Sequence, residues 1–81
     1  MIYKLPIVLE PQPEGGFTVT CPLLPELITE GDTVEEVMEN VQDALAAVIE
    51  AYEDLGRPLP PSIQPTKVEQ PLQLDALVSV A

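Results

Sequence analysis

Four carboxylates lie at the ends of the predicted elements, where several acids together could do metal chemistry. They are Glu10, Glu30, Asp32 and Glu36. Converging carboxylates can hold two divalent metal ions and so support phosphodiester hydrolysis. With 14 acidic residues among 81, however, carboxylates come near one another by chance. Acids beside a helix start also serve as caps and interact favourably with the helix dipole. We therefore predict capping and a solvated face here, and not a metal-dependent nuclease.

The single cysteine lacks the neighbours of a catalytic thiolate. A nucleophilic thiolate needs a base or a positive charge beside it, and the chain has no histidine. Cys21 shares one predicted strand face with Phe17 and Val19, which indicates a buried core thiol. The pair Gly15-Gly16 lacks the lysine of a phosphate-binding loop and predicts a turn. We predict no enzymatic activity, catalytic residue, metal or cofactor.

Charge is the most informative bulk property. The formal net charge is −11, because only Lys4, Arg57 and Lys67 oppose the acids. Such a chain repels phosphates, so we expect no direct binding of nucleic acid. It attracts a basic partner and speeds the encounter. The alternative is that the acidic surface only confers solubility.

The elements that position these residues predict a single α+β domain over residues 1–81. Apolar and polar residues alternate along Ile2–Glu10 and Phe17–Cys21, around a glycine turn, and a short strand follows at Leu27–Glu30. We expect an antiparallel three-stranded meander with one long helix on one face and a C-terminal strand, in the order β-β-β-α-β. The expected segments are a meander at 1–31, a helix at 32–56, a proline-rich arm at 57–71 and a strand at 72–81.

The helix has the clearest signals at both ends. Thr33 and Glu36 form a capping box, apolar residues recur at three- and four-residue steps, and Gly56 suits the residue past the end. Its acidic residues mostly avoid the apolar stripe. We predict that they include a partner-binding face made by Glu35, Glu39, Asp43 and Glu50.

The last segment is predicted to be an interface. A domain of this size has a thin core, and oligomerisation is an ordinary remedy. Because a proline-rich arm leads to the final strand, that strand can pair with its own sheet or with another subunit. We predict a homodimer or tetramer with an interface that includes Leu72, Leu74, Leu77, Val78 and Val80.

Targeting signals are not apparent. No apolar run approaches the roughly 18 residues of a membrane span. No basic segment precedes an apolar run at the N-terminus, as a signal peptide would require. We expect a cytoplasmic protein without membrane contact.

The order of several local motifs is similar to that of a known family. Tyr3 lies in the opening strand, Gly15-Gly16-Phe17 starts the next, and Pro22-Leu23-Leu24-Pro25 follows. The run Thr29-Glu30-Gly31-Asp32-Thr33-Val34-Glu35-Glu36 leads into the helix, and Leu59-Pro60-Pro61-Ser62 comes after it. In this order and spacing, residues 3–63 resemble the N-terminal domain of HicB-like antitoxins.

The resemblance implies a partial ribonuclease-H-like fold that serves binding and not catalysis. HicB antitoxins bind and mask HicA, a small basic RNA-cleaving toxin, which fits the acidity of this chain. The alternative is an orphan homo-oligomeric domain of the same fold without a toxin.

This chain departs from the family pattern in two places. Glu26 and Leu27 stand where the family often has glycine and cysteine, so the turn there is expected to differ in detail. Full antitoxins usually continue into a helix-turn-helix or ribbon-helix-helix domain, which we do not expect here. The DNA-binding role of such a domain is not carried over.

Overall fold

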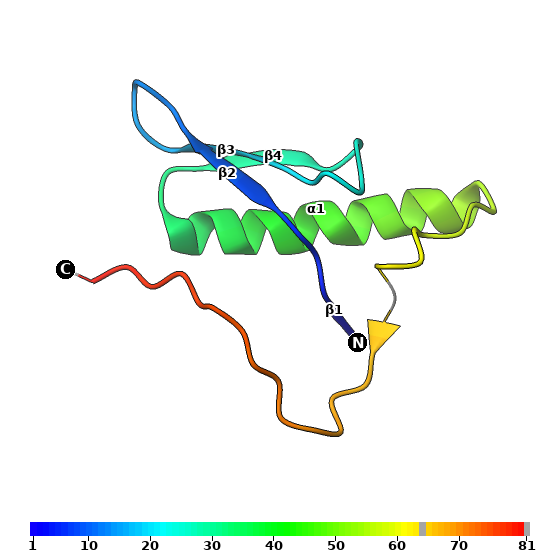
Figure 1. Cartoon of the computed structure of the whole chain (residues 1–81). Helices are drawn as coiled ribbons and strands as arrows, with labels where there is room; N and C mark the ends of the chain where they lie inside the picture. Colours follow the sequence, from blue (N-terminus) through cyan, green and yellow to red (C-terminus); the bar gives the residue numbers. More distant parts are fainter. Residues whose placement is uncertain (64, 81) are drawn as a thin grey trace.

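The three-stranded sheet and the long helix form the body of the molecule. The computed structural model describes residues 1–63 and 65–80, and in that part the elements follow in the order β1 (Ile2–Tyr3), β2 (Val8–Pro11), β3 (Phe17–Thr20), β4 (Ile28–Gly31), α1 (Val34–Asp54) and β5 (Pro65–Thr66). Strands β2, β3 and β4 are antiparallel in that spatial order, and α1 lies along one face (Figure 1). The predicted α+β fold, with its meander and long helix, is confirmed.

The first predicted strand is divided in two. Ile2–Tyr3 form β1 and Val8–Pro11 form β2, while Pro6 lies in the strand-free stretch between them. Proline cannot donate a hydrogen bond to a ladder, so an interruption at Pro6 is expected. Gly15 and Gly16 have φ angles of 104° and 77°, which confirms the glycine turn between β2 and β3.

Helix α1 begins and ends where its caps predict. The side chain of Thr33 accepts a hydrogen bond of 3.1 Å from the backbone N–H of Glu36. At the other end, Gly56 has a φ of 65° and its N–H donates to the carbonyl of Glu53. A left-handed residue there stops the helix while satisfying its last carbonyls. Across the described residues, no helix is long and apolar enough to cross a bilayer.

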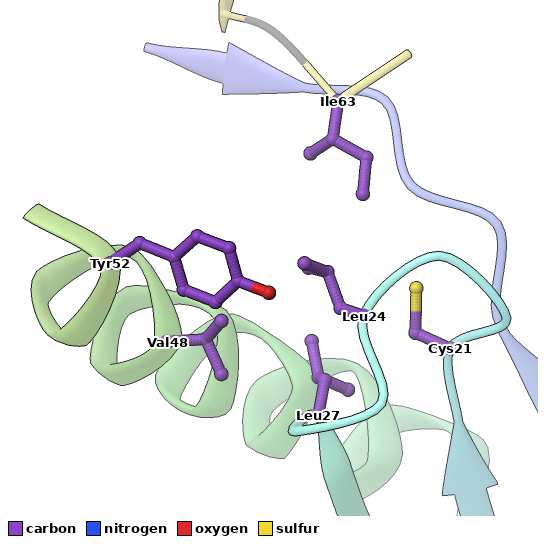
Figure 2. Close-up of a cluster of buried hydrophobic side chains, with 6 residues drawn as sticks. All are labelled: Cys21, Leu24, Leu27, Val48, Tyr52 and Ile63. Atoms are coloured by element: carbon purple, nitrogen blue, oxygen red, sulfur yellow. The ribbon is translucent and has the colours of Figure 1, made fainter. Parts of the chain in front are cut away.

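A small cluster of buried side chains joins the helix to the loops (Figure 2). Val48 and Tyr52 of α1 meet Leu24 and Leu27, which belong to the turns between β3 and β4. Ile63 enters the same cluster from the proline-rich segment and is 0% exposed. The predicted arm at 57–71 is therefore more than a connection, because one of its residues is part of the core.

The C-terminal strand predicted at 72–81 is not found. Residues 72–80 contain no regular secondary structure, and Ala81 lies outside the described residues. Only Pro65–Thr66, within the predicted arm, form a short strand, which pairs antiparallel with β1. A strand is defined by hydrogen bonds to a neighbouring strand, and residues 72–80 pair with no strand in the part of the chain that the structure describes.

Candidate protein-binding surface

The four acidic residues predicted to bind a partner share one exposed face of α1. Glu35, Glu39, Asp43 and Glu50 are all exposed, and they are four, four and seven residues apart. At about 100° per residue, these steps keep the side chains on one side of a helix. The buried residues of α1, which are Val37, Val48 and Tyr52, project from the opposite side. The structure thus brings the four carboxylates together on the side of α1 that faces away from the core.

The charge of this face is not compensated along the helix. Helix α1 contains no basic residue, whereas it carries seven of the 14 acids of the chain. Like charges four residues apart, as at Glu35–Glu39 and Glu39–Asp43, destabilise a helix by about 0.2–0.5 kcal/mol per pair. Glu53 and Asp54 also oppose the dipole at the C-terminus. The acids therefore contribute little to helix stability beyond the first turn, which favours a role outside the fold.

The N-terminal half of α1 is fixed closely to β4. The side-chain amide of Asn40 donates a hydrogen bond of 2.6 Å to the carbonyl of Glu30. Gly31 is buried against the helix, and a Cβ atom at that position would lie 2.8 Å from the backbone nitrogen of Val37. Glycine therefore permits an approach that any side chain would prevent. The acidic face is held on a rigid support.

A polar contact fixes the C-terminal half. The hydroxyl of Tyr52 donates to the carboxylate of Glu26, with distances of 3.1 and 3.0 Å to its two oxygens. The guanidinium of Arg57 lies 5.0 Å from the centre of the Tyr52 ring. Burial raises the pKa of Tyr52 above 10.0, Glu26 raises it further through its hydrogen bond and charge, and Arg57 lowers it. Glu26, a departure from the family pattern, thus has a partner that sequence reasoning missed.

The four carboxylates considered for metal chemistry are only partly brought together. Glu30, Asp32 and Glu36 border one hollow of about 330 Å³ beside the glycine turn, whereas Glu10 is not among its lining residues. Within residues 1–63 and 65–80, no three carboxylates or thiols are placed to hold a metal ion. Cys21 is 4% exposed and is a free thiol. The prediction of a buried core thiol is confirmed.

An apolar groove runs beside the helix, and sequence reasoning missed it. The stretch from β1 into β2 forms one side through Tyr3, Leu5, Ile7 and Leu9, and α1 forms the other. The helix contributes Met38, Val41, Leu45 and Ile49. A signal was present, because the apolar residues of α1 form a stripe wider than the narrow sheet covers. Leu74 and Leu77 of the predicted interface border this groove.

The fold and the exposed surface define a small α+β domain with one acidic helical face. The chain belongs to a family described as the HicB_like antitoxin of bacterial toxin-antitoxin systems, whose model matches residues 4–80. This confirms the resemblance found in the sequence.

Relatives of this chain carry names that agree with the family. Antitoxin HicB 1 of Photorhabdus laumondii is 42% identical over 77 residues, which are 93% of this chain and 50% of that protein. Antitoxin HicB of Escherichia coli K12 is 43% identical over 49 residues, covering 60% of this chain and 36% of the relative. The UPF0150 protein ssr1765 of Synechocystis is 34% identical over 59 residues, which are 73% of this chain and 75% of that protein. The chain thus spans half or less of the length of these two antitoxins.

Proposed function

We propose that this chain is the toxin-binding part of an antitoxin. It binds a small basic RNA-cleaving toxin of the HicA kind in the cytoplasm and neutralises it by protein–protein contact, without catalysing a reaction. Membership of the antitoxin family and the names of the relatives support this role. The observation that carries it is the exposed row of carboxylates at Glu35, Glu39, Asp43 and Glu50 on a firmly held helix.

The charge of this face gives a physical reason for the choice of partner. A protein that cleaves RNA needs basic side chains to bind phosphates. A row of carboxylates competes for the same basic surface and so blocks access of RNA. The net charge of −11 adds long-range attraction to a basic protein and repulsion of nucleic acid.

A charge-reversal experiment tests the acidic face. The protein tested for binding is the product of the neighbouring gene, which the proposal expects to be small and basic, and binding is measured by calorimetry at physiological salt. The test variant is Glu39→Lys/Asp43→Lys, and the matched control is Glu14→Lys/Glu69→Lys, whose residues are exposed but off the helix. Each variant replaces two acids by two bases, so both change the net charge from −11 to −11 + 4 = −7.

The two variants have different expected affinities. An exposed charge pair contributes up to about 1 kcal/mol, and reversal replaces attraction by repulsion. The helix variant should therefore bind at least about tenfold more weakly than the control. The native chain should also suppress cleavage of a labelled RNA by the partner. Equal affinity of both variants would reject the acidic face as the binding surface.

The same measurements distinguish the proposed antitoxin from an orphan domain that has no toxin. An orphan oligomeric domain without a toxin predicts no binding to the neighbouring product and no protection of RNA. That outcome would overturn the proposed antitoxin role altogether.

A further inference from the structure

One part of the apolar groove lies between residues 1–5 and the helix, and residues 72–80 do not line it. This part, called the N-terminal hollow, has a volume of about 410 Å³. Figure 1 shows the N-terminal chain crossing α1 beside it. On the helix side the lining residues are all uncharged, and they are Met38, Val41, Gln42, Leu45, Ala46 and Ile49.

The N-terminal hollow is open to solvent. Met38 keeps 39% of its surface exposed, and Gln42 and Ala46 are exposed beside it. The other helix residues of the hollow are half-buried. A concave apolar surface with polar residues around it indicates an interaction site.

The acidic row on α1 borders this hollow directly. Residues three and four positions apart are neighbours on the surface of a helix. Three residues of the hollow each come three positions after an acid of the row, and the pairs are Glu35–Met38, Glu39–Gln42 and Asp43–Ala46. Carboxylates therefore line one side of the apolar surface along the helix.

This arrangement specifies the chemistry of an occupant. Protein interfaces have an apolar centre and a polar rim, and charges across them are complementary. Helix α1 has no basic residue to neutralise the row. An occupant that satisfies both surfaces carries apolar side chains on one face and lysine or arginine next to them.

The shape of the hollow favours a helix as the occupant. From Met38 to Ile49 the wall formed by α1 extends about 16 Å, or about three helical turns. A docked strand gains affinity from main-chain hydrogen bonds to a sheet edge. The backbone groups of α1 along this wall already bond within the helix, so an occupant meets side chains there. An amphipathic helix binds a groove in this way.

We propose that the N-terminal hollow and the acidic row together bind one basic amphipathic helix of the toxin. Its apolar side chains enter the hollow, and its lysine and arginine side chains lie along the row. This inference rests on the proposed antitoxin function and adds the contact that holds the complex together. Buried apolar anchors control dissociation, whereas exposed charges mainly speed association.

Binding kinetics at several salt concentrations test the hollow. The immobilised protein is the product of the neighbouring gene, and the test variant is Met38→Gln/Ala46→Gln. The control is Ala47→Gln/Leu55→Gln, because both residues are exposed and neither lines the hollow. Each variant replaces one alanine and one large apolar residue by glutamine, so the net charge stays at −11. Unchanged far-ultraviolet circular dichroism would show that both variants are folded.

The two surfaces should affect different rates. The hollow variant should dissociate at least about tenfold faster than the control, because it loses apolar burial and places amides in the hollow. Its association rate should keep the native dependence on salt. Glu39→Lys/Asp43→Lys should instead slow association and weaken that dependence.

Photo-cross-linking identifies the occupant. A benzophenone amino acid in place of Gln42 should capture one peptide of the neighbouring gene product, which mass spectrometry identifies. The captured peptide should carry apolar residues at three- and four-residue steps with lysine or arginine beside them.

Two results would overturn the inference and leave the antitoxin role intact. One is a hollow variant that dissociates no faster than the control. The other is cross-linking only to a second copy of this chain, or to a peptide without the basic amphipathic pattern. A native chain that does not bind the neighbouring gene product at all would reject the proposed function, and this inference with it.

Discussion

Ile63 connects the proline-rich segment to the core, and its truncation tests that connection. The side chain is 0% exposed and lies in the cluster with Leu24, Leu27, Val48 and Tyr52 (Figure 2). Its N–H donates a 2.8 Å hydrogen bond to the carbonyl of Pro60, which closes a turn just before it. The change Ile63→Ala removes three carbon atoms from a site without solvent access.

The expected loss is large relative to the stability of so small a domain. Replacing a buried isoleucine by alanine lowers the free energy of unfolding by about 2–5 kcal/mol. At about 0.05–0.15 kcal/mol per residue, an 81-residue chain has about 4–12 kcal/mol in total. With about 4–8 °C per kcal/mol for a domain of this size, a 3 kcal/mol loss lowers Tm by about 12–24 °C.

Urea unfolding followed by circular dichroism of the helix measures this effect. The matched control is Val68→Ala, because Val68 lies on the same segment and is 50% exposed, so its change should stay within about 0.5 kcal/mol. Ile63→Val should fall between the two, at about 0.5–1.5 kcal/mol. All variants are compared at one protein concentration, since association would shift apparent stability. If Ile63→Ala unfolded no more easily than Val68→Ala, Ile63 would not be a core residue.

Two further predictions concern the contacts that hold α1. Gly31→Ala should lower the free energy of unfolding by about 1–3 kcal/mol, because its Cβ would meet the backbone nitrogen of Val37 at 2.8 Å. Thermal unfolding measures this loss, and a variant as stable as the native chain would contradict the close contact. The pKa of Tyr52 is raised in the folded chain, so folding favours the neutral phenol. The stabilisation of the folded state by the neutral Tyr52 phenol is fully present below pH 10, and it is lost as the pH rises through the pKa of Tyr52 in the folded chain. Tm should therefore fall more between pH 9 and pH 11 in the native chain than in Tyr52→Phe, and equal falls would contradict the assigned cause.

Local signals accounted for most of the elements. Alternation predicted β2 and β3, a short strand was expected where β4 lies, and the Thr33–Glu36 cap with Gly56 predicted both ends of α1. These signals depend on neighbours a few residues apart, which a sequence displays directly. The prediction of a strand at 72–81 was wrong, because a strand also depends on a segment that is distant in the sequence. Its alternation is real, but a strand also needs a partner edge, and no sequence pattern supplies one.

The candidate surface was predictable to a similar degree. The acidic face follows from helical spacing, because steps of four, four and seven residues put Glu35, Glu39, Asp43 and Glu50 on one side of a helix. Their role in binding stays a prediction. The apolar groove was not predicted, because its two sides come from β2 and α1, and its existence depends on the helix covering β3 and β4 more than β2.

The sequence by itself determined the periodic elements and the acidic character of the molecule. These properties follow from residue types and from spacings of two to four residues. Only the tertiary structure decided that Ile63 is a core residue, that Tyr52 binds Glu26 across 26 residues of chain, and that an apolar groove borders the C-terminal segment. The physical reason is that each of these depends on which distant segments pack together, and packing is decided by the shape of the whole chain.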